Sequence, residues 1–223
     1  MCIKNNVVLR NTILLFCFFI SIKTGYSQIL SSQPDKTNTF YAGVVPSALA
    51  NQRIGYQGKI GVYLKDEYEF NFNYGFIKGN FEDKYQGKRI KLEARRLLGN
   101  VPEINDNSYV IPYVGIGYLH RSISSILQGE FSLLVPDNLP LNLGYQNIST
   151  VNGGYLTYGA NMFLENRFVL DFGLGLGYGQ NKVENTNIPE QFSLINEPEF
   201  SQRSPGTYPF PIVIVHFSIS YIL

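Results

Sequence analysis

The stretch that decides the fold is residues 153–180, GGYLTYGANMFLENRFVLDFGLGLGYGQ, which contains two alternating runs joined by a short connection. In the second run, every even-numbered position from 168 to 178 is aromatic or aliphatic, and every odd-numbered position from 173 to 179 is glycine. A period of two is typical of a β-strand, in which successive side chains point to opposite faces. Residues 156–164 alternate in the same way. The stretch therefore predicts a β-hairpin whose turn is Glu165, Asn166 and Arg167.

The two faces of this hairpin have the polarity opposite to that of a soluble protein. Large apolar side chains fill one face, whereas glycine, Asn, Thr and the single acid Asp171 fill the other. A soluble sandwich buries its large apolar side chains and covers its outside with charge. Small polar residues facing inward and large apolar residues facing outward indicate a barrel in lipid, where hydrocarbon replaces the core. The hairpin therefore predicts a transmembrane β-barrel.

The amino terminus has the features of a secretory signal peptide. Lys4 and Arg10 precede an apolar run at residues 13–20, and small residues at Gly25 and Ser27 match a cleavage site. The apolar run is shorter than the roughly 20 residues that a membrane-spanning helix needs. We therefore expect residues 1–27 to be a cleaved signal peptide and residues 28–223 to form the barrel.

The composition of the expected mature chain excludes several classes of protein. Cys2 and Cys17 both lie in the segment removed, so no disulfide or thiolate metal site is predicted. Loss of Lys4, Arg10 and Lys23 leaves 15 basic residues against 17 acidic ones, which is not the charge of a nucleic-acid-binding protein. The 16 Tyr and 16 Phe residues fit a barrel with aromatic girdles.

Six further alternating segments bring the predicted number of antiparallel strands to eight. They are residues 39–45, 54–64, 68–77, 89–95, 109–121 and 209–223. Barrels whose termini face the periplasm have short periplasmic turns and longer external loops. The predicted periplasmic connections are residues 65–67, 99–108 and 165–167. The predicted external loops are residues 46–53, 78–87, 122–152 and 181–207.

The last strand carries a family resemblance. Its outward positions alternate to the final residue as Val213, Val215, Phe217, Ile219, Tyr221 and Leu223. With the cleavage site at residues 25–27 and the glycine alternation at 113–117 and 170–175, the chain resembles the small OmpA/OmpX-like outer-membrane barrels of gram-negative bacteria. The resemblance implies an integral outer-membrane location, contact with outer-membrane lipid and recognition of the last strand by the insertion machinery. The residues that it assigns to this insertion signal are Phe217, Ile219, Tyr221 and Leu223.

Charged residues at inward positions predict a network inside the barrel. They are Lys59, Arg89, Lys91, Glu93, Arg95 and Asp171. An eight-stranded barrel is just wide enough to be filled by its own side chains. A charge facing lipid near the midplane would cost several kcal/mol, so we expect pairing in the lumen, with Arg89, Lys91 and Arg95 as candidate partners of Asp171. Ion pairs that close the lumen are the main interpretation, and a narrow channel for ions or small solutes is the alternative.

A second alternative, an enzyme, depends on His120 and Ser122, which are predicted to face the membrane near the outer leaflet. The His-x-Ser pair resembles the lipid A deacylases, and a triad would need a carboxylate, for which Glu130 is the nearest downstream candidate. The simpler interpretation is an interfacial His and Ser at a strand end. With only two histidines, no metal site or cofactor is predicted, and His216 is expected to be a hydrogen-bonded lumen residue.

The external loops remain as the predicted place of function. Residues 122–152 and 181–207 contain several apolar side chains, and long loops often carry function. We therefore predict a non-enzymatic, structural or surface-interaction role through these loops, with an unidentified surface ligand.

Overall fold

The computed structural model describes residues 38–46, 55–65, 67–79, 85–99, 101–105, 108–133, 141–165, 167–188, 192–196 and 205–223. All of them belong to one compact unit, Thr37–Leu223. Within these ranges, no helix is long and apolar enough to cross a membrane. The predicted signal peptide lies outside the described residues.

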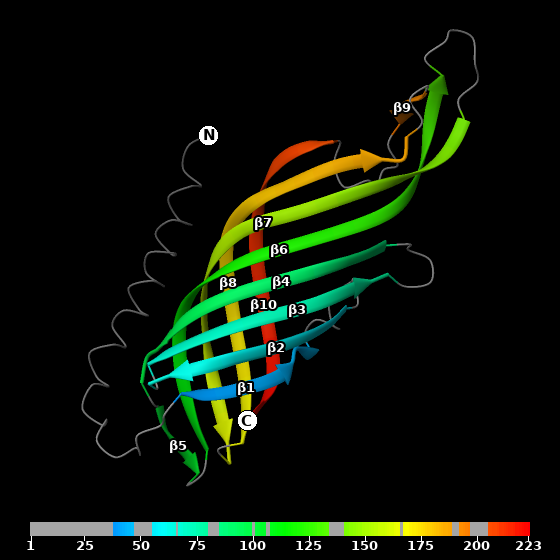
Figure 1. Ribbon diagram of the computed structural model, residues 1–223. Coiled ribbons are helices and arrows are strands. Elements are labelled where there is room, and N and C mark those ends of the chain that lie inside the picture. The colour runs from blue at the N-terminus through cyan, green and yellow to red at the C-terminus, as the bar shows by residue number, and fades with distance from the viewer. Residues whose placement is uncertain are drawn as a thin grey trace, which may run out of the picture. The chain divides into compact units, whose positions relative to one another are not determined.

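The described residues form a single antiparallel sheet of ten strands. These are β1 (Thr39–Val44), β2 (Gly55–Leu64), β3 (Tyr68–Lys78), β4 (Tyr85–Leu97), β5 (Val101–Asn105), β6 (Ser108–Leu133), β7 (Leu141–Leu164), β8 (Phe168–Thr186), β9 (Phe192–Asn196) and β10 (Gly206–Ile222). Eight of them close into a ring in the order β1, β2, β3, β4, β6, β7, β8, β10, because β10 pairs with β1 and β4 pairs with β6 (Figure 1). The predicted eight-stranded antiparallel barrel is confirmed.

Alternation along the strands separates the inside of the barrel from the outside. On β8, Asp171 is fully buried, whereas Phe172 and Leu174 are exposed on the outer wall. The same alternation runs along β3, where Phe70 and Phe72 point outward and Asn71 points inward. Large apolar side chains therefore cover the outside of the barrel, as the sequence predicts, and two apolar clusters also lie inside it, one that includes Ile111 and Phe163 and one that includes Val151 and Ile212.

The tight turns and the carboxyl end of the chain lie together at one end of the barrel. Lys65 and Glu165 begin the two short turns in the left-handed conformation, with φ of 49° and 51°. At the same end, the Leu223 amide donates to the Phe40 carbonyl at 2.9 Å. The predicted connection at residues 99–108 contains one more strand, β5, which pairs with β6.

The predicted external loop at residues 122–152 is largely strand, and the one at residues 181–207 contains the end of β8, all of β9 and the start of β10, so this part of the prediction is wrong. β6 and β7 stay paired from Ser108↔Leu164 to Phe131↔Leu141, β8 continues to Thr186, and β9 pairs with β6 (Figure 1). We call residues 121–133 of β6, residues 141–151 of β7 and β9 the paired arm. The sequence prediction failed because the outward positions become polar at Ser122 and Ser124, although the inward positions, such as Ile123, remain apolar.

Inside the ring, three buried tyrosine rings lie against inward glycines. Tyr41 lies against Gly61, Tyr113 against Gly159 and Gly173, and Tyr155 against Gly117, Gly175 and Gly177. A Cβ atom at most of these glycines would overlap the tyrosine ring or its hydroxyl. The inward glycines therefore provide the space in which the tyrosines cross the lumen.

Adding one carbon at this packing should destabilise the barrel. In Gly173→Ala, the new Cβ would overlap the Tyr113 hydroxyl and the His216 ring, so we expect the free energy of unfolding to fall by about 1–3 kcal/mol. In the matched control Gly154→Ala, the new Cβ faces outward and its nearest neighbour is the Gly117 carbonyl oxygen at 3.7 Å. Urea unfolding in detergent micelles measures both variants, and equal midpoints would contradict the packing argument.

Candidate functional site

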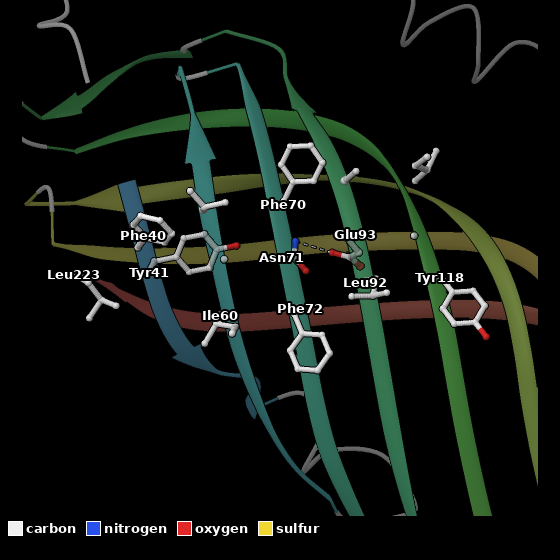
Figure 2. Close-up of a pocket in the computed structure, with 15 residues that line it drawn as sticks. Phe40, Tyr41, Ile60, Phe70, Asn71, Phe72, Leu92, Glu93, Tyr118 and Leu223 are labelled. Atoms are coloured by element: carbon white, nitrogen blue, oxygen red, sulfur yellow. Dashed lines mark hydrogen bonds between the residues drawn. The ribbon is translucent and has the colours of Figure 1, made fainter. Parts of the chain in front are cut away.

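The outer wall of the barrel is an apolar belt. Its exposed side chains include Phe40, Ile60, Phe70, Phe72, Leu92, Ile116, Leu156, Leu174, Leu176, Val213 and Val215. Figure 2 shows Phe70 and Phe72 on β3 on either side of Asn71, whose amide turns away from them and donates to Glu93 Oε2 at 3.2 Å. A shallow groove of about 780 Å³ crosses this wall between β1 and β6, and its lining is almost entirely apolar. Such a wall is stable against hydrocarbon and not against water.

On the side of the barrel next to the arm, the apolar belt ends where a row of aromatic side chains is followed by a row of polar ones. Tyr118 and Tyr178 lie in register through Gly154, and the next outward row consists of His120, Asn152 and Gln180. Both His120 Nδ1 and the Tyr118 hydroxyl contact Asn152 Oδ1, at 2.7 and 3.0 Å. This change from aromatic to polar side chains is typical of a membrane interface.

The lumen contains a buried network in which every strand of the ring takes part. We call it the lumen network, and its members are Tyr41, Lys59, Glu69, Glu93, Arg95, Tyr113, Tyr155, Asp171 and His216. Glu69, Tyr113 and Asp171 are 0% exposed, so water does not reach them from either end of the barrel.

Arg95 is the centre of this network because its guanidinium reaches all three carboxylates. Its NH1 group lies 3.2 Å from both oxygens of Glu69 and 2.9 Å from Asp171 Oδ2, and its NH2 group bonds to Glu93. The face of the guanidinium lies over the Tyr113 ring, 4.1 Å from its centroid. A buried charge is tolerated only when it is paired and hydrogen-bonded, and Arg95 meets both conditions for carboxylates on three strands.

A second cation, Lys59, links two of the same carboxylates. Its Nζ atom lies 2.7 Å from Asp171 Oδ2 and 3.3 Å from Glu69 Oε1. His216 Nε2 lies 3.1 Å from both oxygens of Asp171 and 3.0 Å from Arg95 NH2. Asp171 therefore joins β8 to β2, β4 and β10 across the lumen.

One tyrosine hydroxyl donates to each carboxylate. Tyr113 donates to Asp171 Oδ1 at 2.8 Å and Tyr155 donates to Glu93 Oε1 at 2.6 Å. Tyr41 donates to Glu69, which also accepts from Asn161 Nδ2 at 2.8 Å. The tyrosines that lie against glycine thus complete the hydrogen bonding of the acids. At this level the lumen is filled by side chains.

The structure places the six charges predicted for the lumen on the inner face of the barrel, but not all of them in the network. Lys59, Glu93, Arg95 and Asp171 belong to it, whereas Arg89 and Lys91 form no ion pair with Asp171. Asp171 pairs instead with Lys59 and Arg95.

Sequence reasoning left Glu69 out of the predicted network. The alternation along β3 places Glu69 at an inward position, and it is the only acid among the inward residues of that strand. This pattern could have assigned Glu69 to the network. No comparable signal marked Tyr155 as a donor.

The proposed catalytic residues are not brought together. His120 contacts Asn152, and the Ser122 hydroxyl accepts from Thr150 Oγ1 at 3.5 Å. Glu130 lies ten residues beyond His120 on the continuous strand β6, about 33 Å away at the rise of a β-strand. The imidazole of His120 therefore has an amide, not this carboxylate, as its partner. Among the described residues, no group of three or more His, Cys, Asp or Glu side chains could hold a metal ion.

No family model and no curated protein matches this chain in sequence. Among solved structures, the N-terminal β-barrel domain of OprF from Pseudomonas aeruginosa has 14% identity over 85% of this chain and 100% of that chain, with a TM-score of 0.41. A major outer membrane protein from Thermus thermophilus has 13% identity over 84% of this chain and 100% of that chain, with a TM-score of 0.43. Likenesses at this level carry no argument about function.

The class of protein follows from the chain's own structure. The antiparallel ring is closed, its outer wall is apolar, and a network of charged and polar side chains lies inside it. These three properties together define a transmembrane β-barrel.

The importance of Arg95 can be measured by removing its charge. In Arg95→Met, Glu69, Glu93 and Asp171 would stay buried, and their basic partners within the described ranges would be Lys59, next to Glu69 and Asp171, and His216, next to Asp171. Glu93 would lose its only ion-pair partner among the described residues, so we expect the free energy of unfolding to fall by about 3–5 kcal/mol. The neighbouring Arg96 is exposed, so Arg96→Met should change it by less than about 0.5 kcal/mol. Urea unfolding in micelles compares the two, and equal stability of both variants would show that the network does not hold the barrel together.

Proposed function

We propose that this protein is an integral outer-membrane barrel with a structural or surface-interaction role, exerted by the paired arm and not through the lumen. An apolar belt, with the carboxyl end of the chain and the tight turns at one end of the barrel, fits the arrangement of outer-membrane barrels. The last strand supports insertion in such a membrane, since Ile219, Tyr221 and Leu223 are exposed on the outer wall, where Phe217 stacks on Phe172 at 4.7 Å.

The observation that carries this proposal is the length of the β6–β7 ladder. Beyond the interfacial pair His120↔Asn152, eleven further residue pairs follow, from Arg121↔Val151 to Phe131↔Leu141. At roughly 3.3 Å per residue, they extend about 36 Å along the strands. A spanning strand needs only about 9–11 residues, so the arm is not required to cross the bilayer.

The arm has its own packed interior. Phe131 and Tyr145 are 0% and 2% exposed, and their rings meet edge to face with centroids 5.8 Å apart. β9 pairs with β6 at this point, so three strands support the cluster. A preordered surface loses less conformational entropy on binding than a flexible loop, which favours a binding role.

At the base of the arm, a groove of about 1230 Å³ offers a surface for such a partner. Its lining combines apolar residues such as Phe76 and Ile126 with polar ones such as Gln86 and Gln146. A mixture of apolar contact area and hydrogen-bonding groups is what protein interfaces use.

The lumen, in contrast, is unsuited to conduction because Arg95, Tyr113 and Asp171 fill it. We therefore expect the purified protein to show no conductance steps in planar bilayers, under conditions in which a large porin in the same lipid conducts. Reproducible steps from the wild-type chain would favour the channel instead.

The arm can be tested by site-specific photo-cross-linking on intact cells. We expect a probe at the exposed position Gln128 on the arm to yield one reproducible protein adduct, whereas a probe at Glu67, exposed in a tight turn at the opposite end, should not yield it. Replacing residues 127–145 by an Asn-Gly turn keeps the pair Ile126↔Gln146 as the end of the hairpin.

The shortened chain should insert normally and no longer compete for that partner. Capture of the same partner by the full and the shortened chain would refute a role for the arm.

A further inference from the structure

A row of inward residues lies in the lumen between the lumen network and the arm. It runs across four neighbouring strands, from Gln57 on β2 through Gly75 on β3 and Arg89 on β4 to Arg121 on β6. The next inward position of β4 towards the lumen network is Lys91, which is 4% exposed. Three cations are therefore close together on β4 and β6.

Two of these cations, Arg89 and Lys91, form no ion pair with the carboxylates of the described inner wall. In the described part of the chain, Glu69, Glu93 and Asp171 form ion pairs with Lys59, Arg95 and His216, and no ion pair involves Arg89 or Lys91. Over the described inner wall, five Lys and Arg side chains face three carboxylates. The excess of positive charge lies at the end of the lumen next to the arm, because the carboxylates are concentrated at the lumen network.

The positive charges of Arg89, Lys91 and Arg121 lie at neighbouring inward positions and repel one another. Burial makes this repulsion larger than it would be in water. The contact of Arg121 with Phe210 offsets part of the free-energy cost of burying its charge, since the guanidinium carbon lies 5.3 Å from the ring centroid. Arg89 has no such aromatic contact in the described residues. A bound anion would stabilise Arg89 and Lys91 at once.

The row also contains a small niche that would hold part of an anion. A space of about 10 Å³, about the size of one water-sized group, is lined by Gln57, Gly75 and Arg89. Gln57 is 7% exposed, and its Nε2 atom is buried without a hydrogen-bond partner. A residue with an unpartnered buried amide and an arginine thus line the same space, which has room for one oxygen atom.

We propose that the end of the lumen next to the arm binds a phosphate group, with one oxygen in the niche between Gln57 and Arg89 and with Lys91 and Arg121 supplying further positive charge. The guanidinium fork matches the geometry of an oxyanion, and a lysine acts beside it as a point charge. The phosphate could be inorganic phosphate or the phosphoryl group of a sugar phosphate. Arg121 is the one residue named for this site that also belongs to the paired arm, and phosphate binding does not depend on a partner of the arm.

The test is calorimetric titration of the full chain, folded in non-ionic micelles, with inorganic phosphate and separately with glucose 6-phosphate, at constant ionic strength. Saturable binding of either ligand supports the proposed site. The ligand with the lower Kd shows whether the site takes free phosphate or the phosphoryl group of a sugar phosphate. Arg89→Gln should weaken binding by about tenfold to a hundredfold, the value of one charge-assisted hydrogen bond. Arg96→Gln, which removes an exposed arginine from the outer side of the same strand, should leave the Kd unchanged.

A second variant keeps the result decisive if Arg89→Gln folds poorly. Gln57→Leu keeps the volume of the side chain but removes the amide donor, and should weaken phosphate binding severalfold. We also expect phosphate to raise the unfolding temperature of the wild type and of Arg96→Gln but not that of Arg89→Gln. No saturable binding to the wild type, or equal Kd values in Arg89→Gln and Arg96→Gln, would overturn the proposal.

Discussion

The interaction on which the rest of the structure depends is that between Arg95 and three buried carboxylates. Glu69, Glu93 and Asp171 come from β3, β4 and β8, so a single guanidinium joins distant parts of the ring. In a soluble barrel, the hydrophobic effect would hold the walls together from within. Here the outer apolar side chains face lipid, so charge pairs and hydrogen bonds hold the inside together alongside two buried apolar clusters, and these polar interactions are strong because they are buried away from bulk water.

The sequence was sufficient to predict the ring because period-two alternation determines which way each side chain points. Lys59, Glu93 and Asp171 could be assigned to the inside on parity alone, long before any partner was known. Their pairing could not be predicted in the same way. Lys59 and Asp171 are separated by 112 residues and meet across the lumen, and that meeting depends on the stagger of the strands around the ring.

The paired arm was missed for a different physical reason. Within the membrane, the outward positions are apolar and the inward ones small or polar, so the contrast between the faces is large. Past His120 the outer face meets water, and residues such as Ser122 and Ser124 give a pattern that resembles a loop. The strand continues because the inner positions Ile123 and Phe131 still pack. A prediction that followed the inward positions alone would have extended the strand.

The tyrosines that lie against glycine have a consequence for how this sequence can change over evolutionary time. Gly159 is bounded by the Phe172 carbonyl oxygen and by Tyr113, and Gly173 by Tyr113 and the His216 ring. Almost no other residue can therefore occupy either position. Outward positions such as Leu174 and Val213 meet fluid hydrocarbon, where one aliphatic side chain serves as well as another. Amino-acid substitutions should therefore accumulate at the apolar outward positions and be rare at the packed inward positions. In a soluble protein, by contrast, the hydrophobic residues are usually the ones that change least.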